Sequence, residues 1–307
     1  MRTLRFHSYG EPAAVLRLED APPPRPGSGQ IRVAVEACGL NPADWALCGG
    51  LFAGDLPRGV GLEVSGTVDA IGDGVIGVTV GDAVFGPAPF TGPTAGASEH
   101  ATLDVWFPRP PGLDPVAAAA LPMAVETAYR GLDDLGVAAV DTVLVHGAGT
   151  TVGYAAVQIA ARRGAHVLAT AGKTHADALR AAGAEVTGYG DGMVERVRAL
   201  AGGPVDRVLD AAPVSNALPE LVRMVATPEH VLTLSDFTAA EELGVRSSFG
   251  TGTTLRYEVL GEYAKLASTG DFSVPVARTF ALEDWTTAVE LSRSGQARGK
   301  LVLQIAG

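Results

Sequence analysis

Residues 142–153 read Thr142-Val-Leu-Val-His-Gly-Ala-Gly-Thr-Thr-Val-Gly153, and this segment is the strongest indication of the fold. The apolar run Thr142–His146 predicts a buried strand, and a helical pattern follows from Gly153 to Arg163. Glycines 147, 149 and 153 fall between the two elements. Glycine permits a tight turn and lets the backbone approach a pyrophosphate, while the start of a helix supplies N–H donors. Because of this context, the stretch predicts a dinucleotide-binding turn rather than an ordinary glycine-rich connection.

The same alternation of strand and helix continues along the middle of the chain. Apolar strand-like runs are followed by helical stretches, which is typical of βαβ units around a parallel sheet. The expected strands are His166–Thr170, Val205–Asp210 and His230–Leu234, and the expected helices are Thr174–Ala182 and Ala217–Val225.

The two ends of the chain have a different pattern. Residues 1–113 are rich in β-formers, Pro and Gly; Ile31–Ala37 reads as a strand, and Gly61–Phe85 holds three strand-like pieces separated by glycines. A helix, Glu283–Ser294, and a strand, Lys300–Ile305, are too small for a domain, so we expect them to return to the first one. The predicted fold is α/β, with a parallel-sheet domain (119–255) inserted in a β-rich domain (1–118 and 256–307).

The end of the second strand of the middle region indicates which nucleotide is preferred. Sites that prefer NADH have Asp or Glu there to hold the ribose hydroxyls, but this chain has Ala169-Thr170 followed by Gly172 and Lys173. A cation beside the adenosine ribose suits a 2′-phosphate. We therefore expect NADPH, with Lys173 as a surface lysine of no special role as the alternative.

Composition excludes several classes of function. The formal net charge is −11 and there is no long basic run, so a nucleic-acid groove or an anionic membrane surface is disfavoured. The N-terminus lacks the apolar segment of a signal peptide, and no run of about 18 apolar residues occurs. With only two cysteines, Cys38 and Cys48, we expect a cytoplasmic protein in which both are small core residues.

Five further segments, in order along the chain, carry a resemblance to a known family. They are Cys38-Gly-Leu-Asn-Pro-Ala-Asp44, Gly61-Leu-Glu-Val-Ser-Gly66, Gly81-Asp-Ala-Val-Phe-Gly86, Leu121-Pro-Met-Ala-Val-Glu-Thr-Ala128 and Gly299-Lys-Leu-Val-Leu303. Together with the glycine turn they resemble the medium-chain dehydrogenase/reductase superfamily, in its zinc-free quinone oxidoreductase and enoyl reductase-like branch. The resemblance implies a GroES-like first domain, a doubly wound Rossmann domain, a homodimer, and a cofactor held between the domains.

The resemblance also implies roles for individual residues. Asn41 and Thr127 would contact the nicotinamide half of NADPH. The pyrophosphate would lie on Gly147, Gly149, Thr150, Thr151, Val152 and Gly153. Gly172, Lys173 and Tyr189 would lie at the adenosine phosphate. The loops lining the cofactor would contribute Ala211, Ser235 and Phe249, and Lys300 corresponds to the Gly-Lys near the family's C-terminus.

The chain departs from the family at several positions. Where zinc enzymes have a Cys and a Gly-His-Glu segment, it has Leu40-Asn41 and Gly61-Leu62-Glu63, and the four-cysteine lobe is missing. Four ligands are needed for a structural zinc site, so we predict no zinc. Thr150 replaces a glycine of the usual turn, Pro213 stands where Gly is more usual, and Glu126 lies in a segment that is normally uncharged.

These features predict a reductase that transfers hydride from NADPH to an enone or a quinone, a small-molecule substrate. Trp45, Leu47, Phe52 and Phe90 are candidates for an apolar substrate wall, and each can equally be a core residue. No proton donor is identified from the sequence. Two alternatives stay open: a non-redox enzyme such as a lyase or cyclase on the same scaffold, motivated by Thr150 and Glu126, and a sensor that binds NADPH without turnover.

Overall fold

The computed structural model describes residues 1–213, 215–250 and 252–305, which form two compact units. Unit 1 comprises Met1–Met123 and Tyr257–Gly307, and unit 2 comprises Ala124–Arg256. Unit 1 is thus built from two stretches of chain, and unit 2 is inserted between them in the sequence.

Unit 2 is a parallel sheet with the strand order β11-β10-β9-β12-β13-β14. Its first strand in sequence is central, and the order reverses beside it, which is the doubly wound arrangement. The elements are α4 (Pro122–Asp134), β9 (Thr142–His146), α5 (Thr151–Arg162), β10 (His166–Thr170), α6 (Lys173–Ala181), β11 (Ala184–Thr187), α7 (Met193–Ala201), β12 (Arg207–Asp210), α8 (Leu218–Val222), η1 (Pro228–His230), β13 (Val231–Thr233), α9 (Phe237–Leu243) and β14 (Arg246–Ser247).

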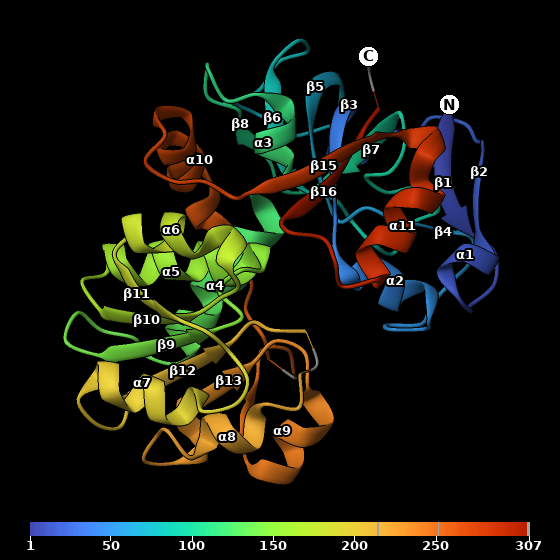
Figure 1. Cartoon of the computed structure of the whole chain (residues 1–307). Helices are drawn as coiled ribbons and strands as arrows, with labels where there is room; N and C mark the ends of the chain where they lie inside the picture. Colours follow the sequence, from blue (N-terminus) through green and yellow to red (C-terminus); the bar gives the residue numbers. More distant parts are fainter. Residues whose placement is uncertain (214, 251, 306–307) are drawn as a thin grey trace. The chain divides into compact units, whose positions relative to one another are not determined.

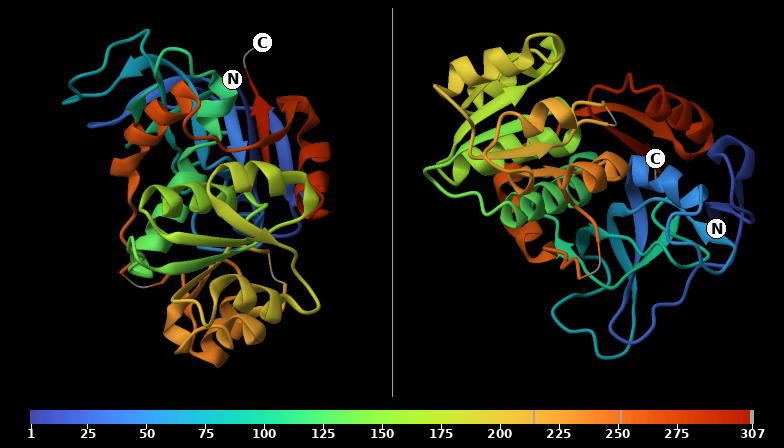
Figure 2. Two further views of the ribbon diagram at one scale, coloured as in Figure 1. Left: turned by 60° about the vertical axis from the view of Figure 1, so that its left-hand side comes forward. Right: turned by 90° about the horizontal axis from the view of Figure 1, so that it is seen from below.

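Both faces of this sheet are covered, which explains its continuous apolar strands. Helices α4, α5 and α6 lie on one face, and α7, α8 and α9 lie on the other (Figures 1 and 2). Val143, Leu144 and Val145 of β9 are fully buried, because neighbouring side chains of the strand point to opposite, covered faces. The parallel register sets His166 beside Thr142 and Val208 beside Leu144, so the strands end at one edge.

Unit 1 contains a larger, mainly antiparallel sheet with the order β15-β16-β3-β5-β6-β8, in which β7 also pairs with β3, and a small sheet with the order β2-β1-β4. The elements are β1 (Arg2–Phe6), α1 (Pro12–Val15), β2 (Leu16–Asp20), β3 (Ile31–Leu40), α2 (Pro42–Cys48), β4 (Arg58–Gly59), β5 (Glu63–Ile71), β6 (Ala83–Pro87), β7 (His100–Leu103), β8 (Phe107–Pro108), α3 (Pro115–Ala119), η2 (Tyr257–Val259), α10 (Leu260–Thr269), β15 (Val276–Ala281), η3 (Leu282–Asp284), α11 (Trp285–Arg293) and β16 (Lys300–Gln304).

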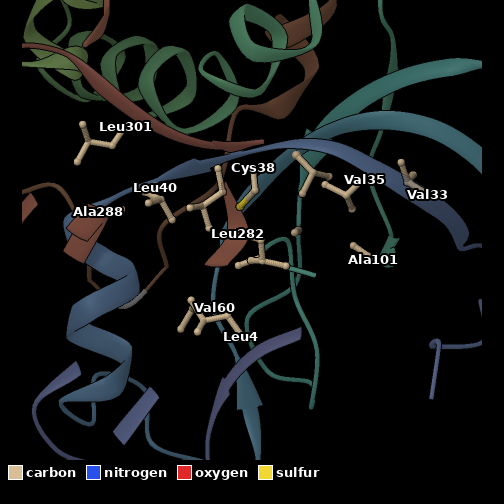
Figure 3. Close-up of a cluster of buried hydrophobic side chains, with 14 of the residues drawn as sticks. Leu4, Val33, Val35, Cys38, Leu40, Val60, Ala101, Leu282, Ala288 and Leu301 are labelled. Carbon is tan, nitrogen blue, oxygen red and sulfur yellow. The ribbon is translucent and has the colours of Figure 1, made fainter. Parts of the chain in front are cut away.

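The core of unit 1 is organised around β3. Its first residues alternate between buried and partly exposed, as expected for a strand with one covered face. Val33, Val35 and Cys38 of this strand pack with Leu4 of β1 and Leu301 of β16 in one apolar cluster (Figure 3). The C-terminal strand β16 therefore completes the core that the N-terminal segment begins.

The α/β class, with a doubly wound parallel sheet inserted in a β-rich unit, is confirmed. One local expectation is wrong: Gly61–Phe85 holds parts of two strands, β5 and β6, and not three. The middle piece turns instead, because glycines 74, 77 and 81 take positive φ angles and Ile76 is 89% exposed. Within the described residues, no helix is both long and apolar enough to cross a bilayer.

Candidate functional site

The predicted phosphate turn forms a tight connection between β9 and α5. Gly147 takes a φ of 74°, which glycine adopts without strain. Thr170, at the end of β10, holds the turn: its Oγ1 accepts from Gly147 N (3.2 Å), and its backbone oxygen accepts from Ala148 N (2.9 Å). The first two strands of the sheet therefore fix the turn together.

The three glycines have different surroundings. A Cβ at Gly147 would lie 2.5 Å from Ala212 N, and one at Gly153 would lie 2.4 Å from Gly147 O. A Cβ at Gly149 would meet no atom closer than His175 Cδ2, at 3.8 Å. Gly147 and Gly153 thus permit close packing within the turn, whereas Gly149 leaves an open backbone surface that fits a pyrophosphate.

Thr150 is the N-cap of α5. Its Oγ1 accepts from Gly153 N (3.0 Å) and lies within donating distance of Gly147 O (2.9 Å) and Ala211 O (3.1 Å). The hydroxyl therefore belongs to the turn. The first N–H groups of a helix have no intrahelical acceptor, so those of Thr151 and Val152 remain for an anion at this helix start.

The residues predicted for the adenosine phosphate gather after β10 and β11. These strands pair Thr170 with Thr187, and Ala171 N donates to Thr187 O (3.1 Å). Gly172 is the N-cap of α6, the exposed Lys173 follows it, and a Cβ at Gly172 would lie 3.8 Å from Tyr189 Oη.

A second cation near this point was missed by the sequence reasoning. Arg196 donates from Nε to Thr187 Oγ1 (3.1 Å), from Nη1 to Asp191 O (2.7 Å) and from Nη2 to Gly188 O (3.0 Å). These bonds brace the loop that carries Tyr189 and bring a positive charge to it. The only sequence signal for this role is a basic residue shortly after the third strand of the sheet.

Two buried polar side chains lie next to the predicted phosphate turn. Because Thr170 Oγ1 accepts from Gly147 N, its hydroxyl hydrogen is available for His146 Nδ1 (2.8 Å). Burial lowers the pKa of His146 to about 4, so the imidazole is neutral at pH 7. Asp210 accepts from Thr233 Oγ1 (2.8 Å) and Ala212 N (3.2 Å), and burial raises its pKa to about 6.

Ala211 and Ser235 follow the ends of β12 and β13, beside the turn. Ala211 N donates to His146 O (2.9 Å), and Ser235 Oγ donates to Ala212 O (2.7 Å). The ends of four parallel strands thus meet where the strand order reverses, which is where open α/β sheets bind their ligands.

Glu126 has a buried partner on its own helix. Its Oε1 lies 2.7 Å from Arg130 Nε, and both side chains are almost fully buried. Arg130 also donates to Ser248 O and lies over the ring of Phe249, and Glu126 accepts from Arg256 N (3.2 Å). The pair therefore fastens the segment that carries Phe249. The i, i+4 spacing of opposite charges was a signal for it in the sequence.

Thr127, the other residue of this helix predicted to contact the nicotinamide half, is partly exposed. Its Oγ1 donates a long hydrogen bond to Glu126 Oε2 (3.4 Å).

In unit 1, Asn41 and Lys300 belong to a buried polar cluster. Lys300 Nζ donates to Asn41 Oδ1 (2.5 Å) and forms an ion pair with Glu63, and Asn41 Nδ2 donates to Glu63 Oε1 (2.9 Å). Strand register brings them together: Leu301 of β16 pairs with Leu40 of β3, and Gly39 pairs with Glu63 of β5. The sequence reasoning did not assign Glu63 a role, although it lies in a quoted family segment.

Asp44 supports this cluster from α2. Its carboxylate accepts from Asn41 N (2.8 Å) and Gly61 N (2.6 Å). Burial raises the pKa of Asp44 to about 7, against the lowering effect of the two N–H donors. Asp44 thus ties the start of α2 to the segment that precedes Glu63.

The four candidates for an apolar substrate wall fall into two pairs. Trp45 (8% exposed) and Leu47 (2%) are buried, and Trp45 Nε1 donates to Ser292 Oγ (2.7 Å). Phe52 (50%) and Phe90 (37%) are exposed, with ring centres 5.8 Å apart. The buried Arg58 donates to the backbone oxygens of both Phe52 (2.6 Å) and Phe90 (3.1 Å). The structure thus gives Trp45 and Leu47 a packing role, whereas the rings of Phe52 and Phe90 lie at the surface.

Among residues 1–213, 215–250 and 252–305, no group of three or more His, Cys, Asp or Glu side chains is arranged to hold a metal ion. Leu62 stands at the family's histidine position. Cys38 and Cys48 are free thiols in the core of unit 1, and burial raises the pKa of both. Neither thiol has the features of a reactive nucleophile.

Comparison with known proteins gives two family matches. Residues 27–107 match the alcohol dehydrogenase GroES-like domain, and residues 182–303 match a model described as zinc-binding dehydrogenase. The chain is also 33% identical to the phthioceranic/hydroxyphthioceranic acid synthase of Mycobacterium tuberculosis, over 91% of this chain but only 14% of that protein. The chain therefore spans a small part of the length of that curated relative.

Two solved structures resemble the chain over its whole length. The quinone oxidoreductase from Coxiella burnetii is 29% identical, with a TM-score of 0.82 and coverage of 100% of this chain and 99% of that one. A structure described as an NAD-dependent alcohol dehydrogenase is 28% identical, with a TM-score of 0.85 and full coverage of both chains.

Proposed function

Because the chain belongs to the medium-chain dehydrogenase/reductase superfamily, we propose that it is an NADPH-dependent, zinc-independent reductase of quinones or α,β-unsaturated carbonyl compounds. When bound, NADPH supplies the hydride that the acceptor takes up together with one proton from solvent. The observation that carries the proposal is the open backbone of Gly149 at the start of α5, with Lys173 after β10.

The chain's own residues have distinct tasks in this proposal. The N–H groups at the start of α5 bind the pyrophosphate, with Thr150 holding the turn closed. Lys173, supported by Tyr189 and Arg196, binds the 2′-phosphate, and Ala211, Ser235 and Phe249 line the cofactor. Phe52 and Phe90 present an apolar surface to the acceptor.

Several observations favour NADPH and argue for a zinc-free site. Thr170 at the end of β10 is fully buried and its hydroxyl is used by the turn, so no carboxylate is offered to the ribose hydroxyls there. The name of one structural relative specifies NAD, which makes NADH the cofactor to compare. Leu62 replaces the histidine that a zinc site requires.

Two contacts favour the reductase over the non-redox alternative. Thr150 caps α5 and Glu126 pairs with Arg130, so the two residues that motivated this alternative have structural partners. The homodimer that the resemblance implies is part of the proposal, and light scattering of the purified protein tests it.

The first experiment is a titration of the protein with NADPH and NADH, followed by calorimetry or by fluorescence. We expect a clear preference for NADPH, and stoichiometric NADPH oxidation at 340 nm with quinones or enones. Tight binding without oxidation across a broad panel would favour the sensor. Substrate conversion without loss of 340 nm absorbance would favour a lyase or cyclase.

The variant Lys173→Ala tests the phosphate contact. We expect NADPH binding to weaken about 10- to 150-fold, since a lost charge-assisted hydrogen bond costs roughly 1.5–3 kcal/mol, and NADH binding to change little. Arg180→Ala is the matched control, because Arg180 is an exposed cation on the same helix, paired with Asp177. An equal loss for both nucleotides would show that Lys173 does not read the phosphate.

A further inference from the structure

The side-chain amide of Asn41 is held in one orientation by charged neighbours. Its Oδ1 faces the ammonium group of Lys300, and its Nδ2 faces the carboxylate of Glu63. The reversed amide would set NH2 against the ammonium and oxygen against the carboxylate, so the chemistry of the neighbours fixes the assignment. Glu63 in turn is held by Met123 N, which donates to its Oε2 (2.8 Å).

This arrangement makes Asn41 a stronger hydrogen-bond donor. The positively charged ammonium group of Lys300, next to Oδ1, draws electron density from the amide nitrogen of Asn41. Hydrogen bonds in a chain also strengthen one another in a buried setting. Glu63 accepts one Nδ2 hydrogen, which leaves the second for an acceptor outside these three residues. Glu63 is fully buried and Lys300 is 2% exposed, whereas Asn41 is 9% exposed, so Asn41 is the member that a ligand can reach.

We propose that the second Nδ2 hydrogen of Asn41 binds the carbonyl oxygen of the acceptor, with Glu63 and Lys300 as positioning residues. The inference rests on the proposed reductase function and names the substrate class of that site: acceptors with a carbonyl conjugated to the reduced carbon. Negative charge grows on that oxygen during reduction, and a fixed donor stabilises it without reorganisation. Asn41 thus does what a metal ion does for a carbonyl in a zinc enzyme.

Stability alone does not explain why the chain buries the ion pair between Lys300 and Glu63. Taking a Lys–Glu pair out of water is costly, and apolar residues of similar size are often as stable or more so. Here the pair does one thing that apolar residues cannot do, which is to orient and polarise an amide. The crowding around Glu63 fits a fixed position, since a Cβ at Gly39 would lie 2.5 Å from Glu63 Oε1.

Kinetics of variants test the assignment. We expect Asn41→Ala to lower kcat about 10²-fold, as for the loss of one oxyanion donor, with the Kd for NADPH unchanged. Lys300→Arg should keep most of the rate, because it keeps the charge. The double variant Glu63→Gln/Lys300→Met removes both charges and leaves no unpaired buried ion, so it should fold but lose rate. Ser65→Ala, a buried polar residue on the same strand with its own backbone partner, should leave kcat unchanged.

A second readout does not depend on turnover. The infrared C=O stretch of a ¹³C-labelled enone bound to the cofactor-free protein should move to lower frequency, and this shift should be lost in Asn41→Ala and reduced in the double variant. A shift that is unaltered in Asn41→Ala overturns the proposal. So does a weaker NADPH Kd with unaltered kcat, which would assign Asn41 to the cofactor. If the wild type shifts the C=O stretch but does not oxidise NADPH, the reductase function is refuted, while the assignment of Asn41 as a donor to the carbonyl oxygen stands.

Discussion

At the scale of single residues, the glycines of the nucleotide turn can be separated by what surrounds them. Gly153 packs against Gly147 O and Ala148 Cα, so a side chain there must displace backbone. Gly149 faces open space, so a side chain there disturbs nothing in the protein itself. Substitution of Gly153 should therefore change the stability of the protein, whereas substitution of Gly149 should change nucleotide binding.

We expect Gly153→Ala to lower the free energy of unfolding by about 1–3 kcal/mol, the usual cost of overpacking. Gly149→Ala should leave the free energy of unfolding nearly unchanged but weaken NADPH binding, because the new methyl group occupies the surface proposed for the pyrophosphate. Urea unfolding and a nucleotide titration of both variants check this. Unchanged NADPH affinity in Gly149→Ala would place the pyrophosphate elsewhere.

The role of Thr150 as a helix N-cap was predictable from the sequence, although we did not predict it. A threonine immediately before a helix is a preferred N-cap, and its hydroxyl then binds the N–H two or three residues later. Thr150 does this with Gly153. The sequence comparison treated the same residue as a departure from a glycine, so a family pattern obscured a local physical signal.

At the scale of elements, prediction succeeded where a pattern is local and repeated. Strands β9 and β10 have the predicted bounds, because short apolar runs flanked by turn residues leave few alternatives. The segment between β5 and β6 contains similar apolar residues, Ile76 and Val80, yet it turns and exposes both. Composition alone could not distinguish a buried strand from an exposed loop here, because the covering elements come from elsewhere in the chain.

Helix α4 carries a prediction about Glu126. Removing its charge by Glu126→Gln leaves the buried Arg130 with the longer ion pair to the half-exposed Asp134 (3.9 Å) in place of its buried counter-ion, and breaking a buried pair in this way costs about 3–5 kcal/mol. We expect a loss of that size in urea unfolding. Replacing both residues, by Glu126→Leu and Arg130→Met, should cost much less. If the single and double variants lose the same stability, the ion pair is not what holds the segment that carries Ser248 and Phe249.

The contact between β9 and β10 predicts a pH dependence. His146 has a pKa of about 4 when folded and an ordinary value of 6.5, so the unfolded chain binds more protons between these values. Its contribution to stability is full above pH 6.5 and is lost as the pH falls towards 4. The shift corresponds to about 3 kcal/mol.

The titration of Asp210 changes the free energy of unfolding in the opposite direction to that of His146, over nearly the same pH range. Its pKa is raised from 3.8 to about 6, so the folded chain binds more protons, and its contribution is lost as the pH rises through 6. We therefore compare the wild type with His146→Gln. The difference between their unfolding free energies should change by about 3 kcal/mol between pH 6.5 and 4. A constant difference would mean that His146 does not titrate as the buried site requires.

At the scale of the whole molecule, the candidate sites differ in how well they could be predicted from the sequence. The turn at Gly147–Gly153 is contiguous, so it was predictable. The cluster of Asn41, Glu63 and Lys300 joins residues as much as 259 positions apart, and it exists only because β16 pairs with β3 in one particular register. A shift of that register by one residue would send Lys300 to the other face of the sheet. No local pattern reports such a register.

The last prediction concerns which parts of the chain respond to the nucleotide. The proposal assigns nucleotide contacts to Gly149, Thr151 and Lys173, and it assigns Asn41 to the acceptor. Binding stabilises the state that binds, so amides at the contact points should exchange more slowly with deuterium when NADPH is present. We expect NADPH to protect residues 147–153 and 172–174, while residues 39–45 and the β1–β2 hairpin at the N-terminus are unaffected. Protection that extended to residues 39–45 with NADPH alone would assign Asn41 to the cofactor, and it would contradict the assignment of its amide to the acceptor.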